Sequence, residues 1–391
     1  MRFLVNVLAT IVGLFVFCMI FFFGIMLIGA LFSSDTETVT VKDNSVINLD
    51  ISKIEYDYAG KVTYDDLTFL NNKDKHNGLT DVINAIKNAK TDDKIKGISI
   101  LNNESVLGMA QTKALRDELA DFKKSGKFIY SYADVYSQKS YYLNSVANVI
   151  YLNPIGELEF KGLSTEIMFF KDFQEKSGLK MEIIRHGKYK SAVEPFLENK
   201  MSDANREQTT ELLNSIWKSV VSEIAVTRKI SEKHLNEIAD SLMARSPQMA
   251  LKEKLIDKIA YEDVYHDDIK KALKIDETDD YNKVSIEDYA EKVATTSKDY
   301  NTKDKIAIIY AQGEIASGEG DVDVIGEGSM RRSLQEARKD EDVKAIVLRI
   351  NSPGGNALTS ELIWREIELT KKVKPVVVSM GNYAASGGYY I

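Results

Sequence analysis

The chain contains two copies of one sequence pattern. Residues 92–143 align with residues 340–391 without a gap. Identical residues are spread over the whole alignment: Asp92 with Asp340, Lys96 with Lys344, Asn103 with Asn351, Ser131 with Ser379, and Tyr141-Tyr142 with Tyr389-Tyr390. Solenoid repeats have periods of about 20–50 residues. A match at this much larger separation indicates two copies of a whole domain.

Each copy alternates strand and helix patterns. In the second copy, residues 345–350 form a short β-branched run that suits a strand buried on both faces of a parallel sheet. Residues 359–372 have helical periodicity, and residues 375–379 form the next strand pattern. Strands that alternate with helices predict an α/β fold with a mainly parallel sheet.

An amphipathic helix is expected between the two copies. Within residues 203–242, apolar side chains recur at steps of three and four residues: Leu212, Leu213, Ile216, Val220, Val221 and Ile224. Such a stripe predicts packing against the core or against a neighbouring domain.

The N-terminal residues form a separate segment. Residues 3–32 are almost continuously apolar, and a helix of this length exceeds the ~30 Å hydrocarbon core of a bilayer. A cleaved signal peptide has an apolar region of only about 7–15 residues, and Phe32-Ser33-Ser34 is a poor cleavage site. We therefore favour an uncleaved single-pass anchor over a cleaved signal. Arg2 favours an N-terminus inside the cytoplasm and the remainder outside.

Composition narrows the classes of function. The chain has 391 residues and a formal net charge of −8, which argues against non-specific binding to nucleic acid because that needs a basic surface. The single cysteine, Cys18, lies in the apolar segment, so a disulfide framework is excluded. The histidines lack the spacing of zinc ligands, and no metal site is expected. They are His76, His186, His234 and His266.

These observations divide the chain into five segments. Residues 1–33 are the transmembrane anchor, residues 34–45 a polar linker and residues 46–272 the first α/β domain. Residues 273–304 are charged, contain few large apolar residues and are interpreted as a connection. The second α/β domain occupies residues 305–391.

A candidate nucleophile follows the last predicted strand. Residues 381–389 (GNYAASGGY) place Ser386 in a turn of small residues. Such a turn can expose a hydroxyl, and the start of a following helix can stabilise negative charge. The pattern differs from the α/β-hydrolase elbow, and the plain alternative is a loop of small residues.

A second glycine-rich turn precedes it. In residues 349–356 (RINSPGGN), Pro353 ends a strand pattern, and Gly354 and Gly355 open the backbone so that N–H groups can face a ligand. The functional interpretation is an oxyanion hole. The alternative is an ordinary strand-to-helix turn.

The two copies differ at both turns. Gln138 aligns with Ser386, and Val106-Leu107 aligns with Gly354-Gly355. The fold pattern therefore persists in the first copy without the candidate nucleophile and glycines. Only the second copy could do this chemistry.

A serine nucleophile also needs a base. Residues 185–196 (RHGKYKSAVEPF) form a polar segment in which His186, Lys188 and Lys190 are the candidates. A lysine base must be neutral, which requires burial that lowers its pKa by several units. Ser–Lys is a known variant of the catalytic pair. From the residues alone, solvated lysines are the plainer interpretation.

Together these motifs carry a family resemblance. An N-terminal anchor, GKYKSAVEPF, the tandem α/β repeat, INSPGG and AASGGYY occur in the order found in the long-form signal peptide peptidase A (protease IV) family. The resemblance covers essentially the whole chain. It implies an α/β fold of tandem ClpP/crotonase-like domains with mainly parallel sheets, preceded by one N-terminal transmembrane helix. The first domain would carry the lysine base and the second the serine nucleophile.

The resemblance also implies roles for single residues. Ser386 corresponds to the nucleophile, and Lys190, directly before SAVEPF, corresponds to the general base, with Lys188 the less favoured neighbour. The backbone groups that correspond to the oxyanion site are those of Gly354, Gly355 and Gly387. Gly355 and Gly387 would donate their N–H groups, and Gly354 would shape the loop. No metal, nucleotide or other cofactor is implied.

For function, the resemblance implies a membrane-bound serine endopeptidase that degrades remnant signal peptides after signal peptidase has released them. The expected location is the bacterial cytoplasmic (inner) membrane, with the catalytic domains on the outer, periplasmic face. Expected partners are signal peptides and other membrane-associated peptides, the lipid bilayer, and further copies of the chain in a homotetramer, with no nucleic acid. The cleavage-site preference stays open, as does whether the Ser–Lys pair forms within or between protomers.

The position of Ser386 near the end of the sequence bears on activity. Family members continue well beyond this serine, whereas the sequence ends at Ile391. We therefore expect a truncated piece of an active enzyme, and an inactive chain if these residues are all that is made. The alternatives are a catalytically inactive membrane scaffold and, with less support, a crotonase-type acyl-CoA enzyme, which would need acidic catalytic residues in place of a Ser–Lys pair.

Overall fold

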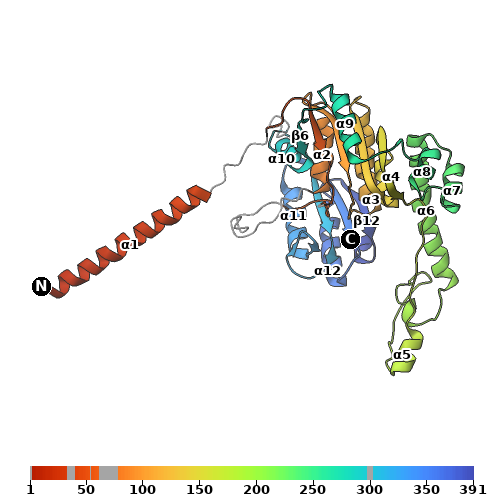
Figure 1. Cartoon of the computed structure of the whole chain (residues 1–391). Coiled ribbons are helices and arrows are strands. Elements are labelled where there is room, and N and C mark those ends of the chain that lie inside the picture. Colours follow the sequence, from red (N-terminus) through yellow and green to blue (C-terminus); the bar gives the residue numbers. More distant parts are fainter. Residues whose placement is uncertain (1, 33–39, 53, 61–77, 297–302) are drawn as a thin grey trace. The chain divides into compact units, whose positions relative to one another are not determined.

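A computed structural model describes residues 2–32, 40–52, 54–60, 78–296 and 303–391 (Figure 1). The chain divides into two compact units, one of Met1–Thr40 with Gly60–Lys75 and one of Val41–Ala59 with His76–Ile391. Residues 33–39, which include the first half of the predicted linker, lie outside the described residues. So do residues 297–302 of the predicted charged connection.

The first unit contains one long helix, α1 (Arg2–Phe32), within its described residues. Its central span, Val5–Ile25, has a mean hydropathy of 2.7, and none of it is buried. By length and composition this helix is able to cross a membrane, a property that membrane anchors and signal sequences share.

The first α/β domain is built on a sheet that has six strands among the described residues. The strands lie in the order β5–β4–β3–β2–β1–β6, and every pairing is parallel. They are β1 (Ser45–Asn48), β2 (Ile95–Leu101), β3 (Phe128–Tyr136), β4 (Val149–Leu158), β5 (Lys258–Ile259) and β6 (Lys283–Ser285). Parallel sheets are covered on both faces, and the apolar run of β2 is accordingly buried along most of its length. The predicted α/β fold with parallel sheets is confirmed.

Helices cover this sheet. They are α2 (Leu79–Ala89), α3 (Met109–Lys123), α4 (Gln138–Asn144), α8 (Pro247–Lys252), α9 (Glu262–Leu273) and α10 (Ile286–Thr296). Helix α9 packs Tyr265 and Ile269 against Val46, Tyr132 and Tyr151 of the strands. Helix α2 packs between α3 and α10.

Part of the segment 273–304, which the sequence predicts as a connection, packs on the first domain. Strand β6 pairs in parallel with β1, and α10 buries Ile286, Tyr289 and Val293. These apolar residues recur at steps of three and four, so a short amphipathic helix holds the segment in place. The low apolar content of the whole segment hides this spacing. Where the domains divide stays a prediction.

The second α/β domain contains two smaller sheets among its described residues. One is parallel, in the order β12–β11–β7, and the other is mixed, in the order β8–β10–β9. The strands are β7 (Lys305–Gln312), β8 (Glu314–Ile315), β9 (Gly320–Asp321), β10 (Val324–Ile325), β11 (Val343–Ser352) and β12 (Val376–Ala384). The helices are α11 (Glu327–Lys339), α12 (Ala357–Thr370) and α13 (Gly387–Tyr390). Leu334 of α11 and Ile363 of α12 pack against Ile346 and Leu348 of β11 in the core.

The sequence repeat is also a structural repeat. Elements β2, α3, β3 and α4 follow one another in the first copy as β11, α12, β12 and α13 do in the second. The first three pairs begin at aligned residues: Ile95 with Val343, Met109 with Ala357, and Phe128 with Val376. The two copies therefore present equivalent turns at the ends of their strands.

An extension leaves the first sheet after β4. It contains α5 (Lys171–Ser177), the short 3₁₀ helix η1 (Glu194–Phe196), α6 (Asp203–Arg228) and α7 (Glu232–Asp240). The predicted helix 203–242 is thus two helices, and its apolar stripe is buried only in the second half of α6. Val220, Val221 and Ile224 are buried there, whereas Leu212 is 59% exposed. The prediction that this stripe packs holds for that half alone.

The C-terminal half of α6 is also held by charge. The guanidinium of Arg116 is buried, and its Nη1 lies 3.1 Å from Glu223 Oε2. The Tyr142 hydroxyl donates to the same carboxylate oxygen at 2.7 Å. A buried charge with a partner of opposite sign and additional hydrogen bonds tolerates the loss of water. This cluster fixes α6 to α3 and α4.

His234, on α7, lies between two carboxylates. Its Nδ1 is 3.2 Å from Glu237 Oε2 and its Nε2 is 2.7 Å from Glu253 Oε2. Hydrogen bonds, first to Glu237 and then to Glu253, raise the pKa of His234 above its ordinary value. The folded state therefore favours the protonated ring, and its contribution to stability is complete below the ordinary pKa of about 6.5. That contribution is lost as the pH rises through the raised pKa.

We expect His234→Gln to lower the melting temperature more at about pH 6 than at about pH 8.5, because only the protonated ring gains from both carboxylates. Thermal unfolding followed by circular dichroism at the two pH values measures the difference. The control is His186→Gln, at an exposed histidine, for which the two differences should be equal. A His234→Gln effect that stays constant or grows with pH would contradict this account.

Candidate active site

Two turns meet at the carboxyl ends of β11 and β12. The strands are parallel neighbours, so their ends lie at the same edge of the sheet. A Cβ on Gly354 would fall 2.6 Å from Gly387 N and 2.7 Å from Ser386 Cβ. The structure thus brings together four of the predicted site residues, Gly354, Gly355, Ser386 and Gly387.

Strand β8 holds the first turn in place. Ile315 N donates to Gly354 O at 2.9 Å, and Asn356 N donates to Ile315 O at 2.8 Å. A Cβ on Gly355 would fall 2.1 Å from Ile315 O, and the φ of this residue is +154°. Steric space and backbone conformation therefore both require glycine here. The hydrogen bonds on either side leave the N–H of Gly355 free of β8.

Ser386 adopts a strained backbone conformation. Its φ is 51° and its ψ is −120°, a region that costs a non-glycine residue on the order of 1–3 kcal/mol. The residue is exposed, and its hydroxyl has no hydrogen-bond partner among the described residues. The preceding residue is fixed because Ala385 N donates to Ser352 O at 3.1 Å. A sharp, strained turn between a strand and a helix can expose a serine hydroxyl to a substrate in this way.

Two backbone donors lie beside this serine without an acceptor. In the part of the chain that the structure describes, neither Gly355 N–H nor Gly387 N–H donates to a protein atom. The position of a Cβ on Gly387 is 3.4 Å from Gly355 N, so the two turns bring these donors close together. Unpaired N–H groups are rare at buried positions, and Gly387 is buried. The two N–H groups can therefore donate hydrogen bonds to an anionic oxygen of a ligand.

Ser352 joins the two turns, a role that the sequence analysis missed. Its Oγ donates to Gly313 O at 2.6 Å and accepts from Gly354 N at 3.1 Å. Its carbonyl accepts from Ala385 N in the second turn. The sequence could have indicated this role. Ser352 directly precedes Pro353 and the two glycines, and the first copy has Glu104 at the aligned position.

Lys190 lies on a different segment. It is exposed in a turn where its N–H lies 3.5 Å from Gly187 O. Its ammonium has no hydrogen-bond or ion-pair partner among the described residues. Within the same residues, no hydrogen bond or ion pair joins it to Ser386. The structure of one chain thus does not bring the two halves of the predicted pair into contact.

Its neighbour Lys188 is a poorer candidate for a base. The Lys188 ammonium donates to the Tyr189 hydroxyl at 3.2 Å and lies 3.6 Å from Glu207 Oε2. The hydrogen bond to Tyr189 and the nearby carboxylate raise the pKa of Lys188. These contacts stabilise the charged form, which cannot accept a proton.

Glu194 anchors the segment that carries Lys190. Its carboxylate is buried and accepts from Asn205 Nδ2 at 2.6 Å. Burial alone would raise the pKa of Glu194, but hydrogen bonds from Ser202 and Asn205 outweigh burial and lower it. Glu194 is therefore ionised and links the segment that carries Lys190 to the first turn of α6.

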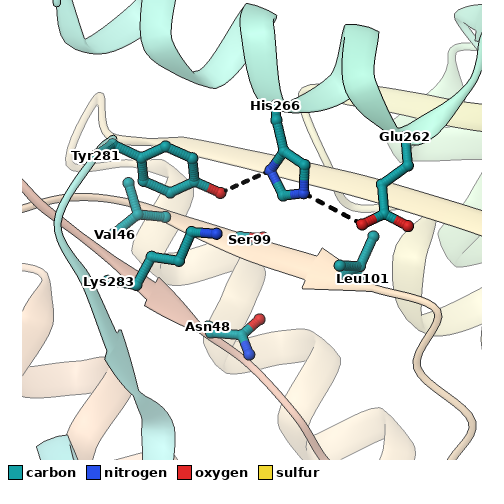
Figure 2. Close-up of a pocket in the computed structure, with 8 residues that line it drawn as sticks. All are labelled: Val46, Asn48, Ser99, Leu101, Glu262, His266, Tyr281 and Lys283. Atoms are coloured by element: carbon teal, nitrogen blue, oxygen red, sulfur yellow. Dashed lines mark hydrogen bonds and ion pairs between the residues drawn. The ribbon is translucent and has the colours of Figure 1, made fainter. Parts of the chain in front are cut away.

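A separate pocket lies over the first sheet (Figure 2). It has a volume of about 170 Å³ and is lined by Val46, Asn48, Ser99, Leu101, Glu262, His266, Tyr281 and Lys283. His266 Nδ1 is 2.9 Å from the Tyr281 hydroxyl, and its Nε2 is 3.3 Å from Glu262 Oε1. The Ser99 hydroxyl is paired with Tyr265. The Ser99 hydroxyl and the His266 imidazole of this pocket are thus engaged by neighbouring side chains. Among the described residues, no three His, Cys, Asp or Glu side chains are grouped to hold a metal ion.

Comparison with known proteins identifies the kind of domain that the chain contains. Residues 121–276 match Peptidase family S49. The chain carries an S49 peptidase domain. The matched residues include Lys190 and its Glu194 anchor.

Relatives of the S49 domain match most of the chain. It is 37% identical to "Protease 4" of Haemophilus influenzae, over 80% of this chain and 52% of that protein. It is 36% identical to "Protease 4" of Salmonella typhi, over 81% and 52% respectively. It is 32% identical to "Serine protease SPPA, chloroplastic" of Arabidopsis thaliana, over 78% and 45%. The chain spans about half the length of these curated relatives.

The close approach of the two turns predicts an effect on stability. We expect Gly354→Ala to lower the free energy of unfolding by about 2–4 kcal/mol, because the added Cβ clashes with the Ser386 turn and the φ of +97° disfavours alanine. Gly126→Ala is the matched control, since its φ is +84° but nothing lies within 4 Å of the added Cβ. Urea unfolding of both variants measures the two effects. Equal losses would show that backbone conformation alone requires glycine at 354.

Proposed function

We propose that this chain is part of a membrane-bound serine endopeptidase with Ser386 as nucleophile and Lys190 as general base. The observation that carries the proposal is the pair of unpaired N–H groups, on Gly355 and Gly387, beside the strained and exposed Ser386. Preorganised backbone donors of this kind stabilise the negative charge that develops on a carbonyl oxygen during acyl transfer. The names of the relatives, "Protease 4" and "Serine protease SPPA, chloroplastic", support the same reaction class.

The residues account for each step of peptide cleavage. The neutral Lys190 amine takes the proton from Ser386 Oγ as this oxygen bonds to the scissile carbonyl carbon. The carbonyl oxygen becomes an oxyanion and accepts hydrogen bonds from Gly355 and Gly387. The C–N bond breaks when the Lys190 ammonium returns its proton to the leaving nitrogen. A water molecule then gives a proton to Lys190, attacks the acyl carbon and releases the acid, and the proton returns to Ser386 Oγ.

The mechanism needs Lys190 to lose its contact with water. A lysine accepts a proton at neutral pH only when burial favours its neutral form, and Lys190 is exposed in one chain. The same extension has exposed apolar side chains, which are Met168, Phe173, Leu179, Met181 and Ile184. A second copy of the chain that covered them would also exclude water from Lys190. We therefore include a homo-oligomer, the homotetramer of the family resemblance, in the proposal.

The proposed substrates and location follow from the resemblance and from α1. The helix is long and apolar enough to hold the enzyme at a bilayer, where remnant signal peptides and other membrane-associated peptides accumulate. Such peptides are apolar, as are the exposed side chains of the extension. The proposed location is the bacterial cytoplasmic (inner) membrane, with the catalytic domains on the periplasmic face.

We expect Ser386→Ala and Lys190→Ala each to lower peptide hydrolysis at least about 10³-fold in the complete protein, because each removes one member of a pair that acts as a unit. Hydrolysis of a synthetic signal peptide measures the loss, and a fluorophosphonate probe should label the wild type at Ser386. Lys188→Ala is the control and should keep most of the activity, because Lys188 is paired with Glu207.

Two outcomes would count against this proposal. Undiminished hydrolysis by Lys190→Ala would remove the Ser–Lys assignment while leaving a serine enzyme with another base. Absence of labelling at Ser386 in an intact, folded wild type would instead favour a non-catalytic membrane scaffold.

A further inference from the structure

The N-terminus of α3, in the first copy, is capped by a residue of the second copy. Asn382 lies in β12, and its Oδ1 accepts hydrogen bonds from Ala110 N at 3.0 Å and Gln111 N at 3.3 Å. Its Nδ2 donates to Gln111 Oε1 at 2.6 Å. The first N–H groups of a helix have no partner inside the helix. The residue at the N-cap position of α3 is Gly108, which has no side chain to satisfy them, so Asn382 supplies the cap.

The contact with Asn382 requires glycine at position 108, because any side chain there would occupy the space that the asparagine fills. Its φ is −75°, a value that any residue adopts, so conformation does not demand glycine. A Cβ at this position would fall 2.2 Å from Asn382 Cγ and 2.4 Å from its Nδ2. The missing side chain thus makes the room that Asn382 occupies.

The second copy shows what has been replaced. Asn356 aligns with Gly108 and caps its own helix, α12, because its Oδ1 accepts from Thr359 N at 3.0 Å. In the first copy the capping asparagine is absent and the cap comes from Asn382. Asp134, which aligns with Asn382, binds Asn102 and Asn153 near its own strand instead. The contact is therefore specific to the pairing of the two copies.

A ring of hydrogen bonds encloses the same stretch of β12. Gln111 Nε2 donates to Asp57 Oδ1 at 3.0 Å, and Arg349 Nε donates to Asp57 Oδ2 at 2.7 Å. Arg349 Nη1 then donates to Met380 O at 2.9 Å, which lies in the strand that carries Asn382. Asp57 is buried, and a buried ion pair of this kind is costly to break from one side. The first copy thus contacts β12 directly at Asn382, and Asp57 is linked to Met380 of the same strand through Arg349 of the second copy.

We propose that Asn382 is a positioning residue for Ser386, through which the non-catalytic first copy sets the geometry of the nucleophile turn in the second. This proposal rests on the proposed function. The chain between the two residues has little slack, since Tyr383 N donates to Asn351 Oδ1 at 3.1 Å and Ala385 N donates to Ser352 O at 3.1 Å. A shift of β12 at Asn382 therefore moves Ser386 relative to the oxyanion donors.

The test compares two substitutions of Asn382 and one of Gly108 in the complete protein. Asn382→Leu removes all three hydrogen bonds at similar volume, and Gly108→Ala displaces the asparagine. Each should lower kcat and the rate of fluorophosphonate labelling by about 10- to 100-fold, since a displacement of about 1 Å can cost this much, with KM changed less than about threefold. Asn382→Asp keeps an acceptor at the helix N-terminus, where negative charge is favoured, and should recover most of the rate.

Two comparisons separate positioning from loss of stability. Gly108→Ala should add little to Asn382→Leu in the double variant, because both act on one contact. Ser231→Ala removes the cap of α7, where the Ser231 hydroxyl accepts from His234 N at 3.2 Å, and should lower the melting temperature without changing the labelling rate. Unchanged kcat and labelling in Asn382→Leu would overturn the proposal. So would a loss in Asn382→Leu that Asn382→Asp does not recover.

Hydrogen exchange separates this proposal from the proposed function. Amides of residues 383–389 should exchange faster in Asn382→Leu and Gly108→Ala than in the wild type, whether or not Ser386 is catalytic. If the wild type is not labelled at Ser386, the proposed function fails and exchange alone decides the positioning role. Unchanged exchange in both variants overturns that role, and faster exchange supports it.

Discussion

The candidate site depends on how closely two backbone turns approach each other at the ends of β11 and β12. No Cβ fits on Gly354, because the space is filled by the Ser386–Gly387 peptide, and none fits on Gly355, because Ile315 lies against it. This contact places one N–H from each turn beside the same serine. It also imposes the positive φ of Ser386, since the residues on either side are held by Ser352 and by α13. A larger side chain at either glycine would separate the donors from the nucleophile.

The first copy shows the same fold without this constraint. Val106 and Leu107 stand where the second copy has glycines, and Leu107 is fully buried in the core. Lys139 aligns with Gly387, and its ammonium donates to Leu107 O at 2.6 Å. A filled turn of this kind has no room for a substrate carbonyl. We infer that the second copy carries the candidate oxyanion site and that the first copy supports it through Gly108 and the N-terminus of α3.

Sequence reasoning reached the parts of the structure that depend on local pattern. The hydrophobic pattern of the second copy predicted its order of strand, helix and strand, with starts within two residues of those of β11, α12 and β12. The small residues around Ser386 predicted its turn. It did not predict β8, which is only two residues long and acts by pairing with a distant loop. It did not predict the cap from Asn382, because the donor and acceptor are far apart in the chain. The stripe of α6 suggested packing along its whole length, yet Leu212 is exposed, because periodicity does not say where a partner lies. Lys190 was reached only through the family resemblance, and its contact with Ser386 stays a prediction.

The most direct test of this account is an experimental structure of the complete protein with a peptidyl phosphonate attached to Ser386. The account predicts that the phosphoryl oxygen accepts hydrogen bonds of about 2.7–3.1 Å from the N–H groups of Gly355 and Gly387. It also predicts that Lys190 Nζ, from the same chain or from another copy, lies within hydrogen-bond distance of Ser386 Oγ. An adduct whose oxygen faces solvent, or an adduct formed on another residue, would contradict it.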